Sequence, residues 1–375
     1  MNHTKKRKLI ISVSNDLTTD NRVKRTCDFL LENNFEIVLL GRELPESLPF
    51  SPNHVQVKRF RLWFNKGPFF YANLNLRLFF FLLINRADFY WSNDLDTLLP
   101  NYLISKWKKK SLIYDSHELF TEAPELIHRP KVKGIWEMLE RKMLPKITNM
   151  ITVNDSIANI FHEKYGIKPL VIRNVPFRLQ NSSPFSKEEL GIASDKKIVI
   201  VQGSGLNVDR GLEEAIEAFT YIENALFLIV GNGDVIPFAK EKVKMLQLSD
   251  KIKFLDKRPY AELMRLTQLA DIGLAIDKPV SLNYQLALPN KLFDYIQAST
   301  AVICSPLKEI KAVVEKYNIG LVIPETSPIE IAKAIQYLLD HPEQLAAFQN
   351  NCKVAAEIEN WEKEKLKLKE LLDSV

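Results

Sequence analysis

Two glycines and an arginine follow a predicted strand in the second half of the chain, a place where parallel sheets bind ligands. The apolar run Lys197–Val201 predicts the strand, which ends in Gln202, Gly203, Ser204 and Gly205. Small residues here allow backbone N–H groups to approach a phosphate. Arg210 stands just before the next helix, where its guanidinium can hold a diphosphate through two parallel hydrogen bonds. A solvated arginine beside a plain glycine turn is the alternative, because short glycine loops are weak signals.

A second anion-binding pattern lies further along, in Leu288-Pro-Asn-Lys-Leu-Phe-Asp-Tyr295. Proline presets the first turn of a helix, so the N–H groups around Asn290 and Lys291 are expected to point at an anion. Asp294 comes one turn later, where a carboxylate can accept two hydroxyl hydrogen bonds from a cis-diol such as a ribose. The alternative makes Asp294 a charge that complements the helix dipole and leaves Lys291 solvated.

Polar side chains also follow the predicted strands of the first half. His117 comes after the run Leu112–Tyr114, between two acidic residues, and we expect it to act directly in an active site. Five further residues are interpreted as an acceptor surface: Asn15, Asp16, Arg22, Asp94 and Glu118. For Asp16 and Asp94 the alternative is N-capping of the next helix, a role that aspartate fills well.

The elements that position these residues alternate between strand and helix, which predicts parallel α/β sheets. Apolar runs predict strands at Leu9–Val13, Glu36–Leu40, Phe89–Trp91, Leu112–Tyr114, Met150–Val153, Leu170–Ile172, Lys197–Val201, Leu226–Val230, Ile252–Leu255, Ile272–Ile276 and Val302–Cys304. The polar, proline-bearing stretch around Gln180–Pro184 predicts a linker. We therefore expect a first domain over residues 1–178 and a second over 179–354. A single charged helix from Gln344 to Leu372, with Val354, Ile358 and Trp361 on its packing face, is expected to return to the first domain from about residue 355.

Four sequence blocks occur in a fixed order in the second half: Gly203…Asp209-Arg-Gly211, Leu228-Ile-Val-Gly231-Asn-Gly233, Ala270-Asp-Ile-Gly-Leu274 and Leu288–Tyr295, which runs on through Ala298 to Ser305. Further blocks stand in the first half: Asn15-Asp16…Asp20-Asn-Arg-Val23, Tyr114-Asp-Ser-His-Glu118 and Val153-Asn-Asp-Ser156. Together they resemble glycosyltransferase family 4, a family of retaining enzymes with the GT-B fold, over nearly the whole chain.

The resemblance implies a fold of two Rossmann-like domains with a cleft between them. It implies donor-binding roles for Gly203, Ser204, Arg210, Gly231, Asn290, Lys291 and Asp294. Arg210 matches the family's basic residue that holds the diphosphate, and Asp294 stands where a glutamate grips the ribose. His117 matches a histidine that faces the donor sugar, so we expect it to donate a hydrogen bond there rather than act as a base. His117 and Arg210 are the expected catalytic residues.

The sequence departs from the family pattern at three places. Ser204 stands where the family often has arginine, so one phosphate contact is either missing or supplied by Lys291. The first glutamate of a two-glutamate motif is lost within Asn283–Leu286, which leaves the contact to the donor hexose open. The glycine loop near the N-terminus of many members is replaced by Asn15–Asn21.

Composition excludes several classes of protein. A formal net charge of +5 over 375 residues is too mild for a nucleic-acid-binding protein. The three cysteines, Cys27, Cys304 and Cys352, show no metal-ligand spacing and predict reduced thiols in the cytoplasm. The longest apolar run, Leu78–Ile84, is shorter than the ~20 residues that a membrane span needs. We expect neither a metal nor a cofactor.

Aromatic residues gather between residues 60 and 91, interspersed with bases such as Arg59, Lys66 and Arg77. The segment is interpreted as a core helix and strand, with seating in a membrane interface as the alternative. If the segment does sit in a membrane interface, we expect the protein at the inner face of the membrane, where it would use a lipid-linked acceptor.

The sequence therefore predicts a metal-independent retaining glycosyltransferase. It would move a sugar from a nucleotide-diphosphate sugar to a hydroxyl of a glycan or lipid-linked glycan, in bacterial surface-glycan assembly. A non-catalytic module that binds sugar nucleotides or glycans is the alternative. An NAD-dependent dehydrogenase or sugar-nucleotide epimerase is disfavoured, because Ser14–Thr18 contains no glycine after the first strand.

Overall fold

The computed structural model describes residues 6–373, except for residues 19, 46, 48 and 180–182. The predicted linker therefore lies partly outside the described residues. The chain forms two compact units, the first running up to Arg173 and resuming at Lys365, the second covering Asn174–Glu364. Each unit is a parallel sheet covered by helices, so the two predicted Rossmann-like domains are confirmed.

The first unit contains a seven-stranded sheet in the order β3-β2-β1-β4-β5-β6-β7. Its strands are β1 (Arg7–Asp16), β2 (Phe35–Glu43), β3 (Val55–Arg61), β4 (Phe89–Asn93), β5 (Ser111–Ser116), β6 (Asn149–Thr152) and β7 (Leu170–Val171). The order reverses between β1 and β4, which are neighbours in parallel register, with Leu9 opposite Phe89. Ligands of such sheets bind beyond the carboxyl ends of the strands at this reversal.

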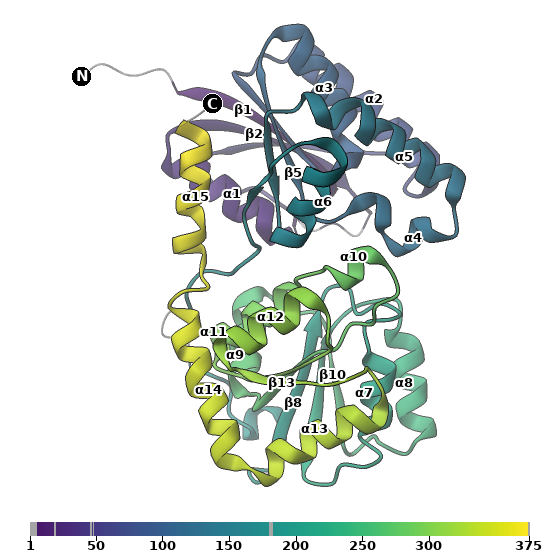
Figure 1. Ribbon diagram of the computed structural model, residues 1–375, viewed down its shortest axis with the longest axis vertical. Coiled ribbons are helices and arrows are strands. Elements are labelled where there is room, and N and C mark those ends of the chain that lie inside the picture. The colour runs from purple at the N-terminus through teal and green to yellow at the C-terminus, as the bar shows by residue number, and fades with distance from the viewer. Residues whose placement is uncertain (1–5, 19, 46, 48, 180–182, 374–375) are drawn as a thin grey trace, which may run out of the picture. The chain divides into compact units, whose positions relative to one another are not determined.

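The helices of the first unit are α1 (Asn21–Glu32), α2 (Gly67–Ile84), α3 (Leu95–Lys108), α4 (Pro124–Ile127), α5 (Pro130–Met143) and α6 (Asp155–Tyr165). Figure 1 shows α2, α3 and α5 on one face of the sheet, with α1 and the end of α15 (Trp361–Asp373) on the other. An ion pair of 2.8 Å joins Lys365 of α15 to Glu32 of α1.

The second unit contains a six-stranded sheet in the order β10-β9-β8-β11-β12-β13. Its strands are β8 (Lys197–Gly203), β9 (Ala225–Gly231), β10 (Ile252–Leu255), β11 (Ile272–Ala275), β12 (Ala301–Cys304) and β13 (Gly320–Val322). Its helices are α7 (Leu212–Ala218), α8 (Ile236–Met245), α9 (Tyr260–Leu269), α10 (Leu282–Gln285), α11 (Asn290–Ala298), α12 (Lys308–Tyr317), α13 (Pro328–Asp340) and α14 (Pro342–Ala356), followed by the first turn of α15.

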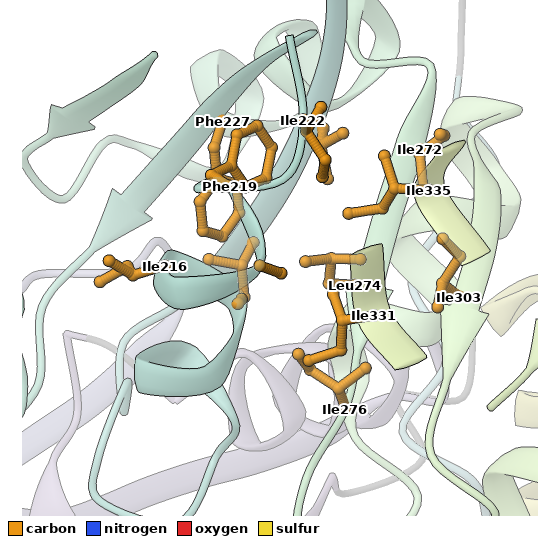
Figure 2. Close-up of a cluster of buried hydrophobic side chains, with 14 of the residues drawn as sticks. Ile216, Phe219, Ile222, Phe227, Ile272, Leu274, Ile276, Ile303, Ile331 and Ile335 are labelled. Atoms are coloured by element: carbon orange, nitrogen blue, oxygen red, sulfur yellow. The ribbon is translucent and has the colours of Figure 1, made fainter. Parts of the chain in front are cut away.

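Helices cover both faces of this second sheet, so its central strands are apolar along their whole length rather than alternating. On one face, side chains of α7 and α13 pack against the strands. Figure 2 shows part of this core, including the stacked rings of Phe219 and Phe227, whose centroids lie 4.9 Å apart, and Ile331 and Ile335 of α13. This packing fixes the carboxyl ends of β8, β9 and β11, where the candidate site lies.

Three elements differ from the prediction. Edge strand β3 was missed, because it alternates apolar with charged residues instead of forming an apolar run. Edge strand β13, Gly320–Val322, was missed as well, because it is only three residues long and begins with glycine. The expected single helix over Gln344–Leu372 is wrong, since it is broken between α14 and α15. Val354 and Ile358 are exposed, so of the three residues of the expected packing face only Trp361 is buried.

Candidate active site

Two glycine loops lock together at the carboxyl ends of β8 and β9. Gly203 pairs with Gly231 in the parallel register, and the amide of Leu206 donates to the carbonyl of Asn232 at 2.9 Å. Gly231 has φ of 129°, and a Cβ built there would lie 1.9 Å from the carbonyl oxygen of Gly203. Only glycine fits this approach. The contact leaves Ser204 exposed at the tip of the loop.

The loop after β8 then presents Arg210 between two left-handed residues. Asp209 has φ of 66° and Gly211 has φ of 78°. A Cβ at Gly211 would lie 2.4 Å from the carbonyl oxygen of Ile276, so glycine is required there too. The Arg210 guanidinium lies over the ring of Tyr284, with its carbon Cζ 3.9 Å from the ring centroid.

Arg210 also pairs with a buried carboxylate. Its Nη1 donates to Oδ1 of Asp277 at 3.2 Å, and Asp277 is fully buried just after β11. The other oxygen, Oδ2, has no hydrogen-bond partner among the described residues. Burial lowers the pKa of Arg210, but Asp277 and Tyr284 outweigh it, and the net pKa is raised. Arg210 is therefore a fixed positive charge in a half-buried place.

Lys291 adds a second cation to this place. It lies in the first turn of α11, whose N-cap is Pro289, and its side chain is half-buried. Burial lowers its pKa, Asp277 opposes this and Arg210 adds to it, so that the net pKa is lowered. Arg210 thus pairs with Asp277, and the charges of both act on Lys291, which is also one of the predicted donor-binding residues. Asn290, the first residue of α11, is exposed beside them. Two cations and the N-terminus of a helix outweigh one carboxylate, which suits an anion.

Asp294 is held by partners from inside the second unit. The side-chain amide of Gln202 donates to Oδ2 at 3.1 Å, and the hydroxyl of Tyr260 donates to Oδ1 at 2.7 Å. Gln202 is itself fixed, since Thr267 donates to its oxygen at 2.5 Å. The carboxylate is buried and oriented, so a ribose would share oxygens that already accept these bonds.

In the first unit, Arg22 lies buried at the end of the sheet rather than on an open surface. Its Nε and Nη2 donate to the two oxygens of Asp115, at 3.1 and 2.7 Å. Its Nη1 donates to the carbonyl of Ile172 at 2.8 Å. Burial raises the pKa of Asp115, but Arg22 and then His117 outweigh it and hold that pKa well below its usual range. Arg22 therefore anchors Asp115, which in turn faces His117.

His117 sits between two carboxylates at the ends of β4 and β5. Its Nδ1 lies 3.3 Å from Asp94 Oδ2, and its Nε2 lies 3.5 Å from Asp115 Oδ2 and 3.1 Å from Asn93 Oδ1. Burial lowers the pKa of His117, but Asp94 and Asp115 outweigh it and raise the pKa to about 9. The side chain is consequently an imidazolium at neutral pH, which donates hydrogen bonds and cannot accept a proton.

Asp94 has a strained backbone. It has φ of 57° and ψ of 168°, a region that is essentially restricted to glycine. It occupies the N-cap position of α3 but makes no side-chain capping bond, and its Oδ1 instead accepts from the amide of His117 at 2.8 Å. Such strain costs about 1–3 kcal/mol and tends to persist at functional sites. The geometry thus favours a role at the site over the capping alternative.

The remaining predicted acceptor residues lie in the loop after β1 or beside His117. Asp16 accepts from the amide of Thr18 at 3.1 Å and from the hydroxyl of Ser47 at 2.6 Å. It does not cap α1, because Asp20 does so through the amide of Val23. Asn15 donates to Asp20 at 3.0 Å. Glu118 is half-buried next to His117.

Sequence reasoning missed several residues of both clusters. Asp277 follows a predicted strand, so the rule that found Arg210 would have found it. Tyr260 and Tyr284 gave no signal, because an aromatic residue near a helix start is ordinary. Asp96 was also missed; burial, and then Asp94, raise its pKa to about 7, and its Oδ1 has no hydrogen-bond partner among the described residues.

Comparisons with known proteins give a family match for the second unit and similar folds for the whole chain. Residues 182–354 match the family described as Glycosyl transferases group 1. No curated protein matches the chain in sequence. Sucrose-phosphate synthase from Thermosynechococcus elongatus is similar in structure, at 16% identity and a TM-score of 0.82, covering 98% of this chain and 99% of that one.

Two further solved structures are similar over nearly their whole length. Anabaena Alr3699/HepE in complex with UDP-glucose is 15% identical, with a TM-score of 0.76 and coverage of 98% of this chain and 100% of that one. WaaG, a glycosyltransferase involved in lipopolysaccharide biosynthesis, is 15% identical, with a TM-score of 0.69 and coverage of 97% and 98%. The chain therefore has the two-domain GT-B fold, and the match over residues 182–354 supports a glycosyltransferase.

Proposed function

We propose that the protein is a retaining glycosyltransferase of family 4 that uses a nucleotide-diphosphate sugar. The observation that carries this proposal is the pairing of Arg210 with the buried Asp277, together with Lys291 in the first turn of α11, whose pKa both of these charges influence. A diphosphate leaving group needs positive charge placed in advance, and preorganised donors of this kind are often the largest single contribution to catalysis.

In the proposed reaction the bond from the anomeric carbon to the diphosphate oxygen breaks, and a bond from the same face to the acceptor oxygen forms. The acceptor proton passes to the leaving phosphate, so no protein nucleophile is needed. Arg210, Lys291 and the N–H groups of α11 stabilise the diphosphate without a metal ion. In the proposed complex the Nε2–H of the His117 imidazolium, which faces Asn93 and Asp115 in the structure, donates to a hydroxyl of the donor sugar instead.

The proposed setting is surface-glycan assembly in the bacterial cytoplasm, with a glycan or lipid-linked glycan as acceptor. WaaG, one of the structural neighbours, is involved in lipopolysaccharide biosynthesis, and Alr3699/HepE is known in complex with UDP-glucose. Uridine diphosphate sugars are therefore the first donors to test.

The decisive experiment measures release of nucleoside diphosphate from a panel of sugar nucleotides, with Arg210→Ala compared with Arg210→Lys. Removing one such charged donor lowers kcat by roughly 100- to 1,000-fold. Lysine keeps the charge but loses the forked geometry, so we expect an intermediate rate. Lys333→Ala, which removes an exposed ion pair with Glu330 on α13, is the matched control and should leave the rate unchanged.

Two further readouts separate the finer points. Unchanged turnover in EDTA supports a reaction without a metal ion, and the anomeric configuration of the product, read by NMR, tests retention. Tight donor binding with no turnover toward any acceptor pool would instead support the non-catalytic binding module.

A further inference from the structure

Helix α2 carries apolar residues on its exposed face as well as on its buried face. Its buried face is formed by Phe70, Leu74, Leu78 and Leu82. Phe69, Leu76, Phe80 and Ile84 are also apolar but exposed, and their spacing places them within one stripe along the helix. A helix that is apolar all round is normally enclosed, so this stripe lacks the covering that its composition calls for.

Neighbouring residues extend the stripe into a larger patch. Trp63 is 79% exposed just before α2, with the guanidinium of Arg77 5.2 Å from its ring centre. The ring of Phe64 contacts that of Phe69, with centroids 5.4 Å apart. Helix α3, which packs beside α2, adds Leu103 and Trp107, the latter 68% exposed. We call these residues the α2–α3 patch: Trp63, Phe64, Phe69, Leu76, Phe80, Ile84, Leu103 and Trp107.

The charges around this patch are mostly positive, although Asp88 pairs with Lys110 at 3.6 Å. Residues 59–87 contain five bases and no acid, and residues 97–114 contain four lysines and no acid. Exposed bases therefore flank the patch at both ends of α2 and at the end of α3: Lys66, Arg86, Lys106, Lys109 and Lys110. Such a ring of cations around aromatic side chains is complementary to an anionic lipid surface.

Helix α2 is packed into the first unit. It therefore lies parallel to any surface that it contacts and does not cross it. Among the described residues it is the one helix long and apolar enough to cross a membrane. However, Leu74, Leu78 and Leu82 are fully buried. Lys108 of α3 also donates to the carbonyls of Leu82 and Asn85, both at 2.7 Å, which ties the end of α2 to α3. Removing α2 to span a bilayer would break this packing.

We propose that the α2–α3 patch docks the first unit onto an anionic membrane surface, with α2 lying in the plane of the interface. A protein partner fits less well, because lysine is depleted at protein–protein interfaces whereas it surrounds this patch. Tryptophan and basic residues are the side chains that gather at the boundary between lipid and water. The proposal uses no residue of the donor site, so it stands apart from the proposed reaction.

The test is flotation of the purified full chain with vesicles, at low salt and without sugar nucleotide. We expect flotation with equal parts of phosphatidylcholine and phosphatidylglycerol, and much weaker flotation with phosphatidylcholine alone or in high salt. The triple variant Phe69→Ser/Phe80→Ser/Ile84→Ser should stay at the bottom, since each lost side chain weakens partitioning by roughly tenfold. Lys66→Glu/Arg86→Glu/Lys106→Glu should lose binding to anionic vesicles as well.

Phe238→Ser/Met245→Ser is the matched control, because both side chains are exposed apolar residues of α8 in the second unit. This variant should float like the wild type. Thermal unfolding and donor hydrolysis of each variant show that the fold survives. Wild-type protein that stays at the bottom with anionic vesicles, or serine variants that float unchanged, would overturn the proposal. Concentration-dependent dimerisation lost in the serine variant, without flotation, would assign the patch to a second copy and also overturn it.

Discussion

The titration of His117 is the sharpest prediction that the structure makes. Asp94 and Asp115 face opposite nitrogens of the ring, and together they raise its pKa from 6.5 to about 9. We expect Asp94→Asn to lower that pKa by at least one unit, because Asp94 makes the larger of the two favourable charge contributions. Asparagine keeps an oxygen that can accept from the amide of His117, so the local geometry should survive.

The size of the effect follows from the two pKa values. One unit corresponds to about 1.4 kcal/mol, so the interval between 6.5 and about 9 corresponds to about 3 kcal/mol of stability. The folded-state pKa lies above the unfolded one. The stabilisation is therefore complete below about pH 6.5 and is lost as the pH rises through about 9. In Asp94→Asn the stabilisation below about pH 6.5 should be smaller, and its loss should end at a lower pH than in the wild type.

The assay is an NMR titration of the imidazole C–H signals, with the His117 signal assigned by its absence in His117→Gln. Denaturant unfolding at several pH values between 6 and 10 gives the corresponding stabilities. Asp155→Asn, which changes an exposed aspartate in the first turn of α6, is the control and should leave the His117 signal where it is. A wild-type pKa near 6.5, or no fall in Asp94→Asn, would refute the reasoning.

Two other substitutions test the contacts that hold the candidate site residues of each unit in place. Arg22→Met removes the cation that makes two hydrogen bonds to the buried Asp115 carboxylate and leaves it only His117. We expect the first unit to lose about 3–5 kcal/mol of stability, measured by denaturant unfolding. Lys24→Met, on the exposed face of α1, should cost little. Gly231→Ala places a Cβ 1.9 Å from the Gly203 carbonyl oxygen, so donor binding, measured by calorimetry, should be lost. The control Gly134→Ala, which has open space around it, should bind the donor normally. Normal binding by Gly231→Ala would contradict the assigned loop contact.

The sequence was sufficient for the order of elements and for the edge of the sheet that carries chemistry. Apolar runs mark β1, β4, β5, β8 and β9, since strands buried on both faces need no alternation. Polar residues after those runs could then be chosen as candidate site residues, because the carboxyl ends of parallel strands lie at one edge of the sheet. Strand β3 escaped the same reasoning because an edge strand alternates and reads like a charged loop.

Pairings between distant residues could not be predicted in this way. Arg22 and Asp115 meet only because β1 and β4 adjoin and β5 follows β4, an order that local patterns do not contain. The break after α14 has a similar origin. Asn360 caps α15 through the amide of Lys363, and the amide of Trp361 donates to the carbonyl of Pro176 at 2.8 Å. The Pro176 contact involves a neighbour far away in the chain, which helical periodicity cannot reveal, whereas the Asn360 cap is a local signal that was overlooked.

The division of the first unit into two chain segments has a consequence for biosynthesis. Leu368 and Leu372 of α15 are buried, and Lys365 contacts α1, yet these residues are made after the entire second unit. Domains fold as units during synthesis at roughly 5–20 residues per second, so the α1 face stays incomplete on the ribosome for on the order of tens of seconds. A nascent chain stalled before residue 365 would present that face to chaperones, and truncation of the last helix would leave it uncovered in the released protein.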